Sequence, residues 1–198
     1  LNAYNTARKG GLIALDLLEG DELTFVTMTD GNCELIVGTK KGMAIRFSEQ
    51  DVRPMGRAAR GVKVMKLKSG DEVIGMSSLK EGDLVLTISE TGNGRLSPID
   101  NYRLQSRGGT GVTNYHVDKN GDVAAIRVVN VNDDAIIISQ DGVIIRIEIN
   151  SIRQCQRPSK GVRVMRIAQG NKVVALAIAP HEDESDEQEE QDKQDLSN

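Results

Sequence analysis

A glycine recurs every 50 residues along this chain of 198 residues, and this spacing constrains the fold more than any other feature of the sequence. The series comprises Gly11, Gly61, Gly111 and Gly161. After each glycine come an apolar-rich segment, a turn and a second apolar segment. Two further series keep the same period without insertion or deletion, namely Gly42, Gly92 and Gly142, and Arg53, Arg103 and Arg153. Three series with one spacing predict repeated copies of one structural unit, in which we expect the arginines to pair with a neighbouring unit.

The apolar segments of each unit have the pattern of β-strands. Runs of five to seven residues rich in Val, Ile and Leu are separated by turns of Gly, Asp and Asn, and no segment holds a helical period over three turns. The Gly-Asp, Lys-Gly and Asp-Gly sites predict hairpin turns, because glycine supplies the positive φ that such turns need. About four strands in a repeat of 50 residues are typical of a propeller-like blade. We therefore predict an all-β, propeller-like partial ring over residues 1–180.

Residues 181–198 differ in composition from the rest of the chain. They carry nine acidic residues and one basic residue, Lys193. The whole chain has a net charge of −4, so subtracting the −8 of this segment leaves +4 on residues 1–180. A segment with so much like charge and no apolar periodicity cannot offset its ordering entropy, which predicts a disordered acidic tail after Pro180. Its role stays open between a solubilising segment and a nucleic-acid mimic that competes for the basic loops described below.

The sequence lacks the patterns of the common enzyme and metal sites. G-x-S-x-G, the P-loop, H-E-x-x-H and the dinucleotide fingerprint are all absent. His116 and His181 are too few for a His-based metal site, and Cys33 and Cys155 stand far apart, which argues against a disulfide scaffold. There is no signal peptide and no apolar run long enough to span a membrane. We expect no catalytic residue, metal or cofactor, and the start at Leu1 rather than Met suggests a fragment or a processed product.

A short basic loop precedes each glycine of the first series. These loops span residues 5–11, 55–61, 105–111 and 155–161, and each carries one or two basic residues and no acidic residue. Equivalent positions of a ring of blades lie on one rim, where Arg and Lys can contact the backbone of a polyanion without reading its sequence. The candidate contact residues are Arg8, Lys9, Arg57, Arg60, Lys63, Arg107, Arg157, Lys160 and Arg163. The alternative is that they are solvated turn residues and that the glycines serve the backbone shape alone.

Basic residues continue into the strand that follows the second and fourth loops. Lys63 and Arg163 share one repeat position, and Lys66 and Arg166 share another. Because strand side chains alternate between two faces, we expect at most one residue of each loop's pair to extend the basic surface, and we assign Lys63 and Arg163 to it. His116 takes the position of Lys66 and Arg166 and is expected to be an exposed residue rather than a ligand.

At these loops the sequence resembles the C-terminal domain of the DNA gyrase A protein. The hallmark box of that family reads Gln-Arg-Arg-Gly-Gly-Lys/Arg-Gly, and residues 105–111, Gln-Ser-Arg-Gly-Gly-Thr-Gly, match five of its seven positions. The segments LLEGDELTFV, EQDVRPMGRAARGVKVMKL and SETGNGRLSPI also look like later blades of that domain, so the likeness covers residues 1 to about 180. An acidic tail after the last blade is also typical of the family. Gyrase is favoured over its topoisomerase IV counterpart.

The resemblance implies a β-pinwheel, a propeller-like ring whose blades exchange strands, and a basic rim that binds, bends and wraps double-stranded DNA. It also implies a place in a bacterial, cytoplasmic, nucleoid-associated type IIA topoisomerase, in which the rest of gyrase A and the gyrase B protein complete an ATP-dependent negative supercoiling enzyme. The family's cleaving tyrosine and ATP site lie elsewhere, so we expect this chain to be non-catalytic.

The chain departs from the family pattern at the hallmark box. No intact box is present, since Thr110 stands in place of its last base, and the first blades of the ring are expected to lie outside this chain. The alternatives are the C-terminal domain of the corresponding topoisomerase IV protein and a propeller-like protein-interaction scaffold. The modest charge of +4 on residues 1–180, low for a DNA-binding protein, favours the scaffold.

Overall fold

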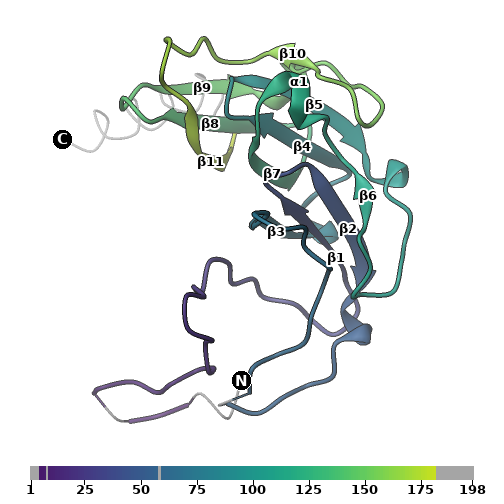
Figure 1. Cartoon of the computed structure of the whole chain (residues 1–198), viewed down its shortest axis with the longest axis vertical. Coiled ribbons are helices and arrows are strands. Elements are labelled where there is room, and N and C mark those ends of the chain that lie inside the picture. The colour runs from purple at the N-terminus through teal and green to yellow at the C-terminus, as the bar shows by residue number, and fades with distance from the viewer. Residues whose placement is uncertain (1–4, 8, 58, 182–198) are drawn as a thin grey trace, which may run out of the picture.

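The computed structural model describes residues 5–7, 9–57 and 59–181 as three antiparallel sheets that follow one another along a curved arc (Figure 1). The strands are β1 Glu34–Thr39, β2 Met43–Ser48, β3 Val73–Ser78, β4 Leu84–Ser89, β5 Asn93–Pro98, β6 Val112–Thr113, β7 Val123–Val129, β8 Asp133–Ser139, β9 Ile144–Glu148, β10 Val162–Arg163 and β11 Val173–Pro180. One short helix, α1, spans Val117–Asn120, and 3₁₀ turns cover Glu49–Asp51, Leu79–Glu81, Ile99–Asn101 and Ile149–Ser151. Within these ranges, no helix has the length and apolar character needed to cross a bilayer.

Successive repeats exchange strands. The sheet orders are β3-β1-β2-β6, β10-β5-β4-β7 and β11-β8-β9. Ala44 of β2 pairs with Val112 of β6, and Gly94 of β5 pairs with Val162 of β10, so both exchanged strands come from 68 residues further along the chain. This exchange confirms the predicted all-β pinwheel with its repeat of 50 residues. The predicted acidic tail from residue 182 onward lies outside the described residues, and the domain division remains a prediction.

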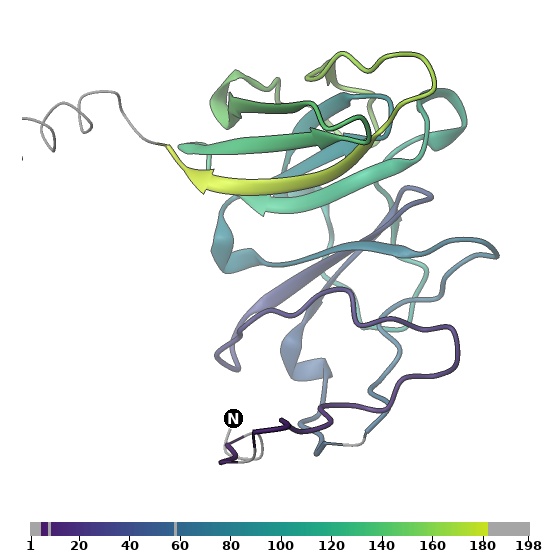
Figure 2. The same ribbon diagram turned by 90° about the vertical axis from the view of Figure 1, so that its left-hand side faces the viewer.

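The hydrophobic core lies between successive sheets, which stack as layers in Figure 2. Ile36 and Ala44 of the first sheet pack in one buried cluster with Val85 and Ile126 of the second. A second cluster joins residues of the second and third sheets in the same way. The apolar runs of the sequence supply this core, and all six residues of β4 are buried because both faces of the middle sheet are covered.

Gly42 and Gly92 combine a turn with a close approach between strands, whereas a Cβ atom at Gly142 would meet nothing within 4 Å. Gly42 and Gly92 have φ values of 81° and 80°, which a left-handed turn position requires. A Cβ atom at these positions would lie 2.2 Å from Tyr115 O and 2.3 Å from Met165 O, atoms of the segments that carry β6 and β10. Hairpin turns are confirmed at Lys41-Gly42 and Asp141-Gly142, which join the paired strands β1–β2 and β8–β9, whereas Gly70-Asp71 joins no two described strands. At Gly42 and Gly92, glycine also allows the exchanged strand to pack closely.

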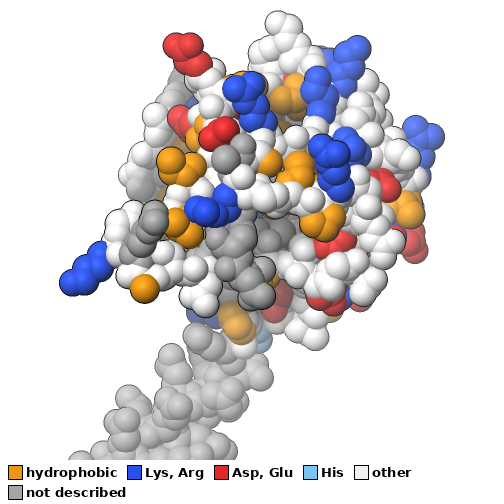
Figure 3. All heavy atoms as spheres, turned by 90° about the horizontal axis from the view of Figure 1, so that it is seen from below, with side chains coloured by type: hydrophobic (Ala, Val, Ile, Leu, Met, Phe, Trp, Pro, Cys, Tyr) orange, Lys and Arg blue, Asp and Glu red, His pale blue; other side chains and the backbone are white. Residues whose placement is uncertain are grey.

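The first repeat does not form the strands that the sequence pattern predicts. Among its described residues, 5–7 and 9–31, no strand is present, because the repeat register places the partners of its apolar segments outside residues 1–198. Its apolar side chains are consequently exposed, with relative exposures of 74% for Ile13, 80% for Val26 and 71% for Met28. Figure 3 looks onto this end of the arc and shows hydrophobic side chains among Lys and Arg side chains.

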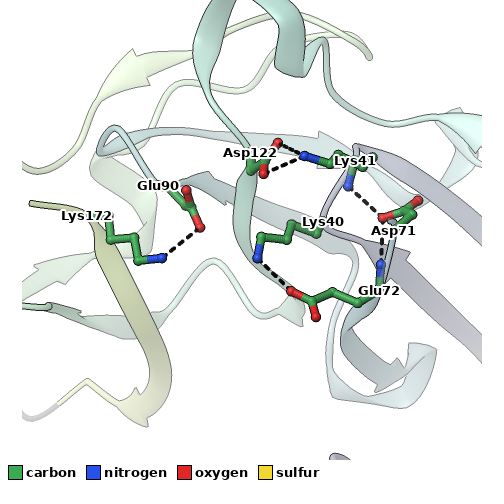
Figure 4. A network of polar contacts seen from close by, with 7 residues as sticks. All are labelled: Lys40, Lys41, Asp71, Glu72, Glu90, Asp122 and Lys172. Atoms are coloured by element: carbon green, nitrogen blue, oxygen red, sulfur yellow. Dashed lines mark hydrogen bonds and ion pairs between the residues drawn. The ribbon is translucent and has the colours of Figure 1, made fainter. Parts of the chain in front are cut away.

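Ion pairs connect the hairpin turns of successive blades (Figure 4). Lys41 Nζ lies 2.8 Å from Asp122 Oδ2, and Lys172 Nζ lies 3.6 Å from Glu90 Oε1. Lys40 pairs with Glu72 within the first sheet, at 2.7 Å. These pairs are partly exposed, so each contributes at most about 1 kcal/mol to stability. Their lysines are already neutralised by carboxylates, which distinguishes them from the cations of the basic loops.

Candidate nucleic-acid interface

Two of the register-related arginines connect their loop to the backbone of the preceding repeat. Arg107 Nε donates a hydrogen bond to Asp51 O at 2.8 Å and Nη1 donates to Lys63 O at 3.3 Å. Arg157 repeats both contacts 50 residues later, with Nε to Asn101 O and Nη1 to Thr113 O, each at 2.6 Å. The sequence predicted these arginines as polyanion contacts and gave no sign of the backbone contacts.

In each of these two arginines, the guanidinium nitrogen Nη2 is left for another partner. No described residue accepts a hydrogen bond from Nη2 of Arg107 or Arg157. The Arg157 guanidinium also lies over the Tyr102 ring, 5.3 Å from its centroid, which restricts its orientation. Arg107 and Arg157 are half-buried, so they hold the loops in place and offer a smaller charged surface than the exposed cations.

The other described cations of the prediction are exposed. No described residue forms a hydrogen bond or an ion pair with their charged groups, in contrast to the paired lysines of Figure 4. They are Lys9, Arg57, Arg60, Lys63, Lys160 and Arg163. Arg8, the remaining predicted contact residue, lies outside the described residues. The loops 5–11, 55–61 and 155–161 therefore present unneutralised charge.

A shallow hollow beside β10 gathers three of the cations. Lys160, Arg163 and Arg166 line this hollow of about 560 Å³, together with Asn93 and Gly161, and no acidic residue lines it. Arg163 and Arg166 are both exposed and both line this hollow, so the expectation that at most one of them extends the basic surface was wrong.

The reason for this difference is an interruption of the strand alternation. Gly92 O accepts hydrogen bonds from both Val164 N, at 2.9 Å, and Met165 N, at 3.1 Å. Two residues therefore oppose one, as in a β-bulge, and β10 itself ends at Arg163, so strict alternation does not extend to Arg166. Gly42 O makes the same double contact with Asn114 N and Tyr115 N one repeat earlier.

The backbone of loop 155–161 is held from below by two buried side chains. Arg95, with 0% exposure, donates from Nε to Ser159 O at 3.1 Å, and Tyr115 OH donates to Lys160 O at 3.2 Å. Burial raises the pKa of the Tyr115 hydroxyl, so it remains protonated and a donor at neutral pH.

The Arg95 guanidinium is satisfied entirely by neutral acceptors. It contacts Ser97 Oγ and Asn114 O, and its Nη2 lies 2.8 Å from Asn114 Oδ1. Sequence reasoning missed Arg95, although one signal was available. It occupies the repeat position that holds Ile45 and Ile145 in the neighbouring repeats, and a charge at an apolar position marks a buried polar contact.

The remaining sequence candidates have simpler outcomes. Arg53, Arg103 and Arg153 are exposed, and no described residue pairs with their guanidinium groups. The Arg153 carbonyl accepts a hydrogen bond from Leu96 N of the neighbouring blade at 3.3 Å, so this arginine meets that blade through its backbone. His116 is exposed, as expected. No group of three or more His, Cys, Asp and Glu that could hold a metal ion occurs in the part of the chain that the structure describes.

Comparison with known families settles the resemblance. A family described as "DNA gyrase C-terminal domain, beta-propeller" matches residues 1–30, 34–80, 83–130 and 133–180. The chain belongs to this family. The DNA gyrase A protein of Staphylococcus epidermidis is 37% identical over 188 residues, which cover 93% of this chain and 21% of the relative. Gyrase A of Haloquadratum walsbyi is 38% identical over 188 residues, covering 93% of this chain and 22% of the relative. The chain thus spans about a fifth of the length of these gyrase A proteins.

Two solved structures share the fold. The C-terminal domain of DNA topoisomerase IV superposes with a TM-score of 0.86 at 24% identity and covers 93% of this chain and 58% of that one. The gyrase A C-terminal domain gives 0.77 at 28% identity, with 86% and 59% covered. The topoisomerase IV likeness shows the fold alone, whereas the family match and the gyrase A relatives support the gyrase assignment made from the sequence.

Proposed function

We propose that this gyrase A C-terminal domain binds double-stranded DNA through its phosphate backbone and bends and wraps it along the outer loops of its blades. The observation that supports this most strongly is the set of exposed, unpaired cations at repeated register positions, on loops without an acidic residue. Arg and Lys contacts to phosphate position a duplex without reading its sequence. Loop 155–161, which Arg157 holds in place, would present Lys160 to the duplex, with Arg163 following it.

This binding is expected to be indifferent to sequence and sensitive to salt. Cations that contact phosphate release counterions, so affinity falls as salt rises. The low aromatic content, 3% of residues without Trp, leaves little means of stacking on unpaired bases, which favours a duplex over a single strand.

Within the parent enzyme, the proposed role is architectural. The wrapped duplex would present a segment for strand passage, with cleavage supplied by the rest of gyrase A and ATP hydrolysis by gyrase B, so that the bacterial holoenzyme introduces negative supercoils at the nucleoid. The domain itself would be non-catalytic and would need no cofactor. A role in topoisomerase IV is the alternative, although the likeness to that enzyme's C-terminal domain shows the fold alone.

Removal of four exposed cations tests the proposal. We expect the variant Arg60→Gln, Lys63→Gln, Lys160→Gln, Arg163→Gln to bind two duplexes of unrelated sequence about 10-fold or more weakly at low salt, and to lose equal affinity for both. Glutamine retains most of the side-chain length and removes the charge. Fluorescence anisotropy with labelled duplexes measures the affinities.

The matched control removes four lysines that already pair with carboxylates. It carries Lys40→Gln, Lys41→Gln, Lys80→Gln and Lys172→Gln, whose partners are Glu72, Asp122, Asp30 and Glu90. We expect less than about 3-fold weakening, because these charges face acidic partners. Equal weakening in both variants would mean that the loss of net charge, and not the position of the cations, explains the lower affinity. An absence of duplex binding by the unmodified chain at low salt would favour the protein-interaction scaffold.

A further inference from the structure

We propose that the hollow lined by Lys160, Arg163 and Arg166 is a phosphodiester-binding site, and that the positions of Thr110, Thr113 and His116 form a gap in the row of exposed cations, so that this arc holds a duplex at two separate points. The inference rests on the proposed function and specifies where along the arc the DNA backbone is held. It adds Arg166, which the sequence pattern had placed on the other face, to the cations of the rim.

The three positions of the hollow carry charge in only some repeats. The position of Lys160 holds Arg60 and Thr110, that of Arg163 holds Lys63 and Thr113, and that of Arg166 holds Lys66 and His116. All nine side chains are exposed, so the difference between the loops is one of chemistry and not of burial. The loop 105–111 and the strand after it have no Lys or Arg at any of the three positions, whereas the loops on either side have one at each.

The hollow has features of a prearranged anion site. Three cations line it, and the double contact at Gly92 O interrupts the strand alternation between Arg163 and Arg166. Arg95 Nε and Tyr115 OH donate hydrogen bonds to the carbonyl groups of Ser159 and Lys160, so they fix the backbone at the edge of the hollow. Prearranged groups lose less conformational entropy on binding, which increases the affinity available from the same contacts.

A buried charge lies beneath the same loop. The acceptors of Arg95 are hydroxyl, amide and carbonyl oxygens, so no carboxylate neutralises its charge within this network. A cation in a low-dielectric surrounding acts over a longer distance than an exposed one, so Arg95 adds positive potential to the hollow without touching the ligand.

The first basic cluster, Arg60, Lys63 and Lys66, lacks this support. For this cluster the repeat position of Tyr115 holds Leu15, whose side chain cannot donate a hydrogen bond to the loop. A Cβ atom at Gly61 would meet nothing within 4 Å, whereas one at Gly161 would lie 2.2 Å from Gly94 O, so the fourth loop is the more tightly seated of the two. The hollow beside β10 is therefore the stronger of the two holding points.

Charge removal at the hollow tests the site. The variant Lys160→Gln, Arg163→Gln, Arg166→Gln is compared with the control Lys40→Gln, Lys80→Gln, Lys172→Gln, which removes the same charge from paired lysines. We expect the slope of log affinity against log salt to fall by roughly 2–3 in the hollow variant, about 0.9 per lost phosphate contact, and by less than about 1 in the control. Thermal melting verifies that both variants fold as the unmodified chain does.

Charge addition at the gap provides the complementary test. The variant Thr110→Lys, Thr113→Arg, His116→Arg places cations at the three neutral, exposed positions, and we expect its slope to rise by roughly 2–3 with tighter binding at low salt. An unchanged slope would mean that loop 105–111 does not lie along the DNA path, which would overturn the two-point arrangement.

The outcomes separate this inference from the proposed function. If the unmodified chain binds no duplex, the proposed function fails and takes the inference with it. If it binds but the hollow variant behaves like its control, only the inference fails. Inorganic phosphate is the second probe. We expect it to compete with DNA no better than chloride at equal ionic strength, whereas stronger competition abolished in the hollow variant would identify a free-anion site and overturn the duplex assignment.

Discussion

Replacement of Asn114 by alanine is expected to lower the free energy of unfolding by about 2–4 kcal/mol, because it leaves buried donors without their acceptor. Tyr102 OH donates to Asn114 Oδ1 at 2.6 Å, and Arg95 Nη2 donates to the same oxygen at 2.8 Å. All three residues are at most 1% exposed, so water cannot replace the lost acceptor without opening the interface between blades. Thermal unfolding would show a lower midpoint, by roughly 5–15 °C for a domain of this size.

The substitution Asn114→Asp is the matched control for this prediction. It keeps the acceptor for Tyr102 and adds a carboxylate beside Arg95, and it loses only the amide donor that contacts Thr87 Oγ1 at 3.2 Å. We expect its stability to stay within about 1 kcal/mol of the unmodified chain at neutral pH. If the Asp and Ala variants were equally destabilised, the account of Asn114 as the shared acceptor would be wrong.

Replacement of Gly161 by alanine is expected to cost about 2–3 kcal/mol more than the same replacement at Gly61. The two glycines have φ values of 77° and 79°, so the penalty for a left-handed alanine, about 1 kcal/mol, is common to both. Only at Gly161 does the added Cβ meet backbone, at 2.2 Å from Gly94 O. The difference between the variants therefore isolates the docking of the exchanged strand β10 against β5.

Gly111 extends this comparison to the other exchanged strand. A Cβ atom there would lie 2.3 Å from Ala44 O, so Gly111→Ala should resemble Gly161→Ala rather than Gly61→Ala. Chemical denaturation of the three variants measures the differences in unfolding free energy. Equal costs at all three positions would mean that backbone conformation, and not strand exchange, explains the glycine series.

The fold was predictable from the sequence where residues 1–198 contain the strands that pair with one another. The period of 50 residues, the strand pattern and the turns at Gly42 and Gly92 all appear in the structure as expected. The first repeat has the same pattern but no strands among its described residues, because strand formation depends on hydrogen bonds to a neighbour that residues 1–198 do not contain. Local pattern indicates what a segment can form, and the partner decides whether it forms.

The candidate site was predictable in its charges and not in its geometry. The exposed cations follow from repeat position, whereas Arg166 lies beyond an interruption of the strand alternation at the two hydrogen bonds to Gly92 O. The contacts of Arg107 and Arg157 go to backbone carbonyls, which every residue possesses, so no side-chain pattern could reveal them. Arg95 alone carried a sequence signal, as a charged residue in a position that is otherwise apolar.

The central claim is that exposed, register-related cations hold the phosphate backbone of a duplex, and the salt dependence of affinity tests it most directly. We predict a linear decrease of log affinity with log salt for the unmodified chain, with one slope for duplexes of unrelated sequence. In the variant without the charges of Arg60, Lys63, Lys160 and Arg163, that slope should be smaller by roughly 3–4. A slope that is the same in both proteins, or that changes with DNA sequence, would contradict the account.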